Sequence, residues 1–176
     1  MGDWIQTYSG LKFDLEDIES NEFSIVDIAH SLSLQCRYNG HSLGMYSVSQ
    51  HSVLASYIAP KELKLTALLH DCSEAYLSDL PRPVKRLPQI YLSYKELEER
   101  ILKAALKQFG GIYPLPDEIH QIDNDLLVTE QHYLMTAPPE PWSTNGKFLK
   151  NVLINPWPSW YAEDQFIKKF VELIKG

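Results

Sequence analysis

The sequence predicts an all-α protein, because apolar residues recur at helical spacing along most of the chain and no useful length of strand alternation is present. The 176 residues, 44% of them hydrophobic, suit one domain with its own core, which we expect to span residues 1–176. No internal repeat is found. We therefore expect a helical bundle that ends in a loop rich in Pro and Trp and a closing helix.

An ordered arm is expected first, over residues 7–22, because this stretch is acidic and has no sustained apolar period. A helix is predicted next, over residues 23–35, and Ser24 suits the position that caps its amino terminus. One stripe of this helix carries Ile25, Val26, Ala29, Leu32 and Ser33.

The next two helices form a predicted hairpin. After a loop at residues 37–41, a second helix covers roughly residues 46–58. A third begins at Pro60, since proline is favoured in the first helical position, and it runs into His70-Asp71.

Four segments complete the predicted fold. A long helix covers residues 91–109 and ends at Gly110-Gly111, and a further helix covers about residues 116–135. Residues 137–160 form a loop, which is either a lid or an oligomer contact. The closing amphipathic helix carries Phe166, Ile167, Phe170, Val171, Leu173 and Ile174.

Composition limits the possible partners. The net charge of -7 and the pI near 5.3 argue against a broad basic face for long nucleic acid, although a small anionic substrate needs only a local positive cluster. No apolar stretch of membrane length and no secretory signal is evident. Cys36 and Cys72 form no metal or disulfide motif, so we expect reduced thiols and a protein of the cytoplasm.

His70-Asp71, with Glu74 three residues later, reads as part of a metal site. Two ionisable residues follow the apolar run 63–69 directly, and a buried carboxylate beside a buried imidazole is costly unless a metal or strong hydrogen bonds compensate. The alternative is a histidine that the dipole stabilises at a helix end. Whether the chain offers further metal ligands distinguishes the metal site from the helix-end histidine.

Asp123 and His51 are the candidates for these further ligands. Asp123 has Ile119, Leu126 and Leu127 at helical spacing, so its carboxylate should point inward, either to a metal or to a buried Arg or helix end. His51 lies on a face of small residues, where a lone histidine is usually structural. Together with His70-Asp71 they supply two imidazoles and two carboxylates, a set that suits a borderline divalent ion.

The order of these residues resembles the HD-domain phosphohydrolase superfamily, and local strings over residues 4–135 resemble its YfbR and YfdR group, which includes deoxynucleotidases and phage dATP hydrolases of the DatZ type. The resemblance implies a homo-oligomeric, metal-dependent enzyme that hydrolyses 2'-deoxynucleotides such as dATP, dADP or dAMP. The matching strings are Asp27-Ile28-Ala29-His30, Cys36-Arg37-Tyr38-Asn39-Gly40-His41, the stretch from Tyr46 to Val53, the stretch from Leu68 to Tyr76, and Asp79-Leu80-Pro81-Arg82-Pro83-Val84-Lys85.

The resemblance also implies the site. It makes metal ligands of His51, His70, Asp71 and Asp123, and two imidazoles favour Co, Mn, Fe or Zn over Mg. Glu74 matches the catalytic acid, and Asp79 matches a residue that orients water or binds a sugar hydroxyl, although it also suits a turn before Pro81.

Other residues are candidates for contact with the substrate. Arg37 and Lys85 fit phosphate contacts, with a solvated lysine as the alternative for Lys85. Tyr38 stands where the monophosphatases that the chain resembles have Trp, and it is a candidate for contact with the base or the sugar. His41 and Trp4 are further candidates. Each of the three side chains could instead serve in packing. His30 is not expected to be a ligand.

Particular residues disfavour two alternative functions. Another HD hydrolase, for an alarmone or a cyclic dinucleotide, is disfavoured because Ala75 stands where alarmone hydrolases have a second acid and no G-Y-P signature is present. An inert nucleotide-binding HD protein is disfavoured by the complete ligand set and Glu74.

Overall fold

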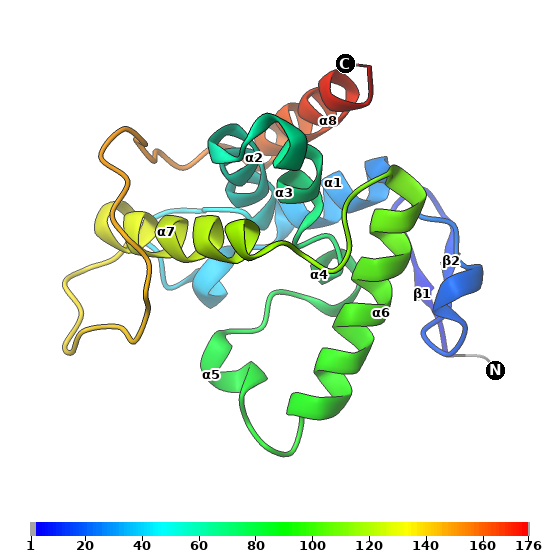
Figure 1. Ribbon diagram of the computed structural model, residues 1–176. Helices are drawn as coiled ribbons and strands as arrows, with labels where there is room; N and C mark the ends of the chain where they lie inside the picture. Colours follow the sequence, from blue (N-terminus) through cyan, green and yellow to red (C-terminus); the bar gives the residue numbers. More distant parts are fainter. Residues whose placement is uncertain (1–2, 176) are drawn as a thin grey trace.

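The computed structural model describes residues 3–175 and is mostly helical, which confirms the predicted all-α class (Figure 1). None of the helices in this part of the chain is long and apolar enough to cross a membrane. The helices are α1 (Ile25–Leu34), α2 (Val48–Ile58), α3 (Lys64–Leu69), α4 (Glu74–Leu77), α5 (Arg82–Lys85), α6 (Tyr91–Phe109), α7 (Asp117–Leu134) and α8 (Ser159–Lys175), with 3-10 turns at Ile18–Ser20, Arg37–Gly40 and Lys61–Leu63.

The amino-terminal arm is ordered by a small hairpin. Strands β1 (Ile5–Gln6) and β2 (Lys12–Phe13) pair antiparallel, with Ile5 opposite Phe13. Phe13 is fully buried and stacks on Tyr76 with ring centroids 3.9 Å apart. The arm is therefore fixed to the body through this aromatic contact.

The main core lies where α1, α2, α3 and α8 pack together (Figure 1). The apolar face of α8 contributes Phe166, which is fully buried, and Phe170. Burying a side chain of this size stabilises the fold by roughly 1.5–3 kcal/mol. Its buried neighbours include Ile28, Leu32, Val53, Leu68 and Leu69.

Local signals set the helix ends. The hydroxyl of Ser24 accepts a hydrogen bond from the Asp27 amide at the start of α1, as predicted. Gly110 ends α6 in the left-handed region with φ 82°, a conformation that costs glycine little. The predicted stripe of α1 was wrong at Val26, which is 41% exposed. Asp27 is buried in that turn instead, because its carboxylate accepts hydrogen bonds from the amide and hydroxyl of Ser9.

The hairpin of α2 and α3 places the polar residues of interest. The α3 helix ends at Leu69, so His70 occupies its carboxyl-terminal cap and Asp71 lies in the turn that leads to α4. The hydroxyl of Ser56 donates to the Lys64 carbonyl and joins the two helices. Because α7 packs against α2, three helices meet at this turn.

Candidate functional site

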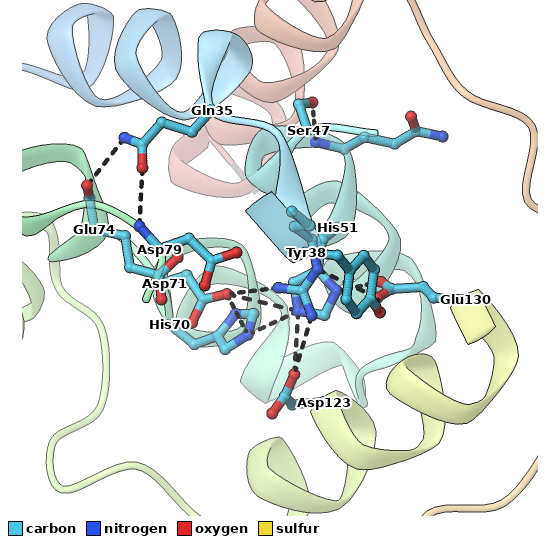
Figure 2. A network of polar contacts seen from close by, with 12 residues as sticks. Gln35, Tyr38, Ser47, His51, His70, Asp71, Glu74, Asp79, Asp123 and Glu130 are labelled. Carbon is cyan, nitrogen blue, oxygen red and sulfur yellow. Dashed lines mark hydrogen bonds and ion pairs between the residues drawn. The ribbon is translucent and has the colours of Figure 1, made fainter. Parts of the chain in front are cut away.

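Four predicted ligands from three helices converge in the structure (Figure 2). His51 on α2 places its Nε2 3.3 Å from Nε2 of His70 and 3.3 Å from Oδ1 of Asp123 on α7. Asp71 Oδ2 lies 3.3 Å from His70 Nε2 and 3.6 Å from His51 Nε2. The inward position that helical spacing predicted for Asp123 brings its carboxylate into this cluster.

The other nitrogen of each imidazole is held by an acceptor. His51 Nδ1 lies 2.6 Å from Oε1 of Glu130, and His70 Nδ1 lies 2.7 Å from the carbonyl of Ala67. A carboxylate and a carbonyl only accept, so both Nδ1 atoms carry the hydrogen. Both Nε2 atoms are thereby directed into the cluster, as they are in metal sites whose histidines are oriented by a hydrogen-bond partner.

The donor set fits a divalent cation. Ligand atoms of His51, His70 and Asp71 all lie within 4.8 Å of one another. Burial raises the pKa of Asp71, but His70 and His51 outweigh it and hold that pKa below its ordinary value. Burial also raises the pKa of Asp123, but His51 and Arg37 outweigh this effect and hold that pKa below its ordinary value. Two ionised carboxylates and two imidazole nitrogens at one point are a suitable set for a borderline divalent ion.

Nε2 of His51 is the atom at which either a proton or such an ion would bind. Burial and Arg37 lower the pKa of His51, yet Glu130 and Asp123 raise it to about 9. Without a metal, the ring therefore carries its second proton on Nε2 at neutral pH. A cation bound there replaces that proton.

Glu130 is a site residue that the sequence reasoning missed. It is fully buried and accepts hydrogen bonds from the hydroxyls of Tyr46 (2.8 Å) and Tyr38, from Arg37 Nε (3.2 Å), and from His51. Burial raises its pKa, but Arg37 and His51 lower it to about 2. The pattern that singled out Asp123 was also present here, since α7 carries Leu126 and Leu134 four residues on either side.

A cavity of about 620 Å³ opens beside the cluster, which is a size suited to a small ligand. The predicted residues Arg37, Tyr38, Asp71, Glu74, Asp79, Lys85 and Asp123 all line it. His41 and Trp4 are exposed and lie outside its lining. Residues that sequence reasoning did not place there are Leu80, Pro81, Arg82, Pro83, Arg86, Leu127, Trp142 and Ser143.

Glu74 is buried in the wall of this cavity. Its Oε1 accepts a hydrogen bond from Lys85 Nζ at 3.0 Å, and Lys85 also pairs with Glu98 at 2.7 Å. Its Oε2 is buried and has no hydrogen-bond partner among the described residues. Burial, and then the carboxylates of Asp71 and Asp79, raise the pKa of Glu74 well above its ordinary value. This environment favours the protonated form of the carboxyl group more than water does.

Gln35, at the end of α1, links the two acidic positions (Figure 2). Its Nε2 donates to the Glu74 carbonyl at 3.0 Å, and its Oε1 accepts from the Asp79 amide at 3.1 Å. Burial raises the pKa of Asp79, whereas Arg37 opposes the shift. The backbone at both carboxyl groups is therefore set by one amide side chain.

Two arginines hold the carboxylates of the cluster. Arg82 donates to Asp123 Oδ2 at 2.7 Å and to Asn124 Oδ1 at 2.8 Å, which leaves Asp123 Oδ1 facing His51. Arg37 is buried and lies 3.5 Å from Asp71 Oδ2 and 3.9 Å from Asp123 Oδ1. The Asp123 carboxylate therefore pairs with arginine and also lies in the cluster, and its role as a metal ligand stays a prediction.

Comparison with known proteins identifies relatives of the whole chain. YfdR of Escherichia coli K12, an uncharacterized protein, is 35% identical over 173 residues, which cover 97% of this chain and 95% of YfdR. An uncharacterized protein of Rhodobacter capsulatus is 36% identical over 124 residues, or 64% of this chain and 62% of its own length. No family model matches.

More distant relatives carry the name 5'-deoxynucleotidase. The protein from Erwinia tasmaniensis is 27% identical over 118 residues, and the one from Cronobacter sakazakii is 30% identical over 105 residues. These matches cover 66% and 56% of this chain but only about half of each relative, 50% and 51%. Because the similarity to YfdR extends over nearly the full length of both proteins, the chain belongs to the family of YfdR.

Proposed function

We propose that this protein is an HD-type, metal-dependent phosphohydrolase of 2'-deoxynucleotides. The observation that carries the proposal is the convergence of His51, His70, Asp71 and Asp123 beside a cavity that Glu74 also lines. Relatives named 5'-deoxynucleotidase support deoxynucleotides as the substrate class. The products would be the deoxynucleoside and phosphate or polyphosphate from dAMP, dADP or dATP.

The ligand atoms would be Nε2 of both histidines, Oδ2 of Asp71 and Oδ1 of Asp123. A bound Co, Mn, Fe or Zn ion would supply positive charge for a phosphoryl oxygen and would lower the pKa of a water molecule. Glu130 and the Ala67 carbonyl would keep the two rings oriented through their Nδ1 hydrogens.

The charge of the cavity supports an anionic substrate. Arg37, Arg82, Lys85 and Arg86 line it together with four carboxylates. A divalent cation held by two of these carboxylates would add two positive charges at the cluster end of the cavity. We assign Arg37 and Lys85 to the non-bridging oxygens of the reacting phosphate, where positive charge stabilises phosphoryl transfer.

Glu74 is assigned as the general acid. Its pKa is raised well above the ordinary value, which favours the protonated form that a general acid needs, and Oε2 is the oxygen without a partner among the described residues. From there the proton would pass to the leaving 5'-oxygen of the sugar or to a leaving phosphate oxygen. Asp79, tied to Glu74 through Gln35, would orient the attacking water or bind a sugar hydroxyl.

A phosphate-release panel tests the proposal. Purified protein loaded with Mn or Co is mixed with deoxynucleoside mono-, di- and triphosphates and with the matching ribonucleotides. We expect turnover that depends on the metal and favours the 2'-deoxy series. An absence of turnover on every nucleotide with every metal would overturn the assignment.

A further inference from the structure

The segment between α7 and α8, residues 136–158, contains no helix or strand, and we call it the strap. It crosses α7 in Figure 1, where it is drawn in yellow to orange. The Lys147 amide donates to Asp125 Oδ1 at 2.8 Å, and the Leu149 amide donates to Thr129 Oγ1 at 3.0 Å. Polar side chains of α7 therefore fix the path of the strap.

One glycine sets how closely the strap approaches α7. A Cβ at Gly146 would lie 2.0 Å from the Asn124 carbonyl oxygen, which is backbone and cannot rotate away. Only a residue without a side chain fits at this point of contact. The contact fixes the register of the strap four residues after Trp142.

Trp142 is half-buried and lines the 620 Å³ cavity. Its ring centroid lies 6.0 Å from that of Tyr38, with the planes tilted by 45°. Leu127, which is one turn beyond Asp123 on α7, lines the same cavity. Trp142 also borders an adjoining groove with Arg82 and Arg86. An aromatic face and an aliphatic neighbour thus lie along the wall that continues from the metal cluster.

We propose that Trp142 is the base-binding residue, with the nucleobase of the substrate stacked on its indole while the phosphate lies toward the cluster. This proposal rests on the proposed function, because it assumes that the substrate phosphate lies in the polar part of the cavity. Tyr38 is less free to play this part, because its hydroxyl is bound to Glu130 beneath the cluster. Stacking tolerates every base, so Trp142 would contribute affinity without choosing among bases.

A substrate without a base separates this role from a general structural one. We expect Trp142→Ala to lower kcat/KM for dAMP roughly 5- to 150-fold and Trp142→Phe to retain most of it. Hydrolysis of 2-deoxyribose 5-phosphate should be unchanged in both variants. Trp160→Ala is the matched control, since Trp160 lies on α8 and is 68% exposed. Equal losses on both substrates, or no loss on dAMP, would overturn the proposal.

Binding provides a readout that does not need hydrolysis. Titration with dAMP should quench tryptophan fluorescence in the natural protein and in Trp160→Phe, but not in Trp142→Phe. If dAMP quenches the fluorescence of Trp142 but no phosphate is released, the result would support the base site and contradict the proposed reaction. The absence of quenching in the natural protein would reject the base site, whether or not hydrolysis occurs.

Gly146→Ala tests the strap with Trp142 intact. The added methyl group cannot fit against the α7 backbone, so the strap must shift and carry Trp142 with it. We expect the same selective loss on dAMP, with the melting temperature recorded alongside to exclude unfolding. Full affinity for dAMP in this variant would show that the register of the strap does not position the base.

Discussion

Glu130 Oε1 lies 2.6 Å from His51 Nδ1, and both side chains are fully buried. The same carboxylate neutralises Arg37, whose Nε lies 3.2 Å away. One side chain thus orients a metal-ligand candidate and balances a buried cation.

Glu130→Gln should weaken metal binding about 10- to 100-fold, as changes to the partners of ligating histidines do. It should also destabilise the fold by about 3–5 kcal/mol, because Arg37 then lacks its buried counter-charge. Metal titration and urea unfolding measure the two effects. The control is Glu118→Gln, an exposed position on the same helix, which should change neither. An unaltered metal affinity in Glu130→Gln would contradict the orienting role.

Metal binding should release a proton at neutral pH. The pKa of His51 is raised to about 9, so below that pH the incoming ion must displace the proton on Nε2. Affinity should therefore rise by about tenfold per pH unit until pH 9 and then level off. Calorimetry with Mn in two buffers of different ionisation enthalpy would count the protons. A pH-independent affinity between pH 6 and 9 would show that the metal ion does not displace a proton from His51.

Asp123→Ala should abolish both bound metal and turnover, since it removes a ligand that faces His51 at 3.3 Å. Asp117→Ala, on an exposed turn of α7, is its control. Arg82→Ala is an informative companion, because it removes only the partner of Asp123 Oδ2. We expect it to retain metal with less than a tenfold loss of affinity, in line with the small contribution of a partly exposed ion pair. Metal content by mass spectrometry distinguishes the three variants, and normal metal in Asp123→Ala would remove this residue from the site.

Glu74→Gln should leave metal content near normal while kcat falls roughly 10²- to 10⁴-fold, the usual contribution of a general acid. The amide keeps the shape of the side chain but has no proton to give to a leaving oxygen. Glu98→Gln serves as comparison, because Glu98 is the other carboxylate on Lys85. Its effect should be much smaller. Equal losses in the two variants would mean that Glu74 acts only by holding Lys85.

Helix positions were predictable wherever local signals set them. The bounds 91–109 of α6 were predicted as observed, because a run of helix-forming residues meets Gly110. His51 was found because it lies on a face of small residues, and Asp123 because a polar side chain on an apolar stripe has to point inward. Glu130 carried the same signal and was overlooked. The homo-oligomer stays a prediction.

Arg82 and Trp142 were not predictable in this way, since their positions depend on contacts between distant segments. Arg82 reaches the site because it bonds across to Asp123 and Asn124 on α7. Trp142 reaches it because the strap is anchored to that helix through Gly146. Loop residues follow no regular apolar spacing, so the sequence pattern does not predict which residues of a loop reach a distant site. His41, by contrast, follows the sharp turn at Tyr38 and Asn39, both with positive φ, and it is exposed.

The amide of Gln35 has one further consequence. The α4 helix has only four residues, too few to hold a fixed orientation by itself, so the alignment of Glu74 is inherited from the end of α1. The candidate metal ligands take their positions from α2, α7 and the end of α3 instead. In the proposed enzyme, metal binding and alignment of the general acid would therefore depend on different helices. A change at Gln35 should then lower the rate of hydrolysis while the metal content stays normal.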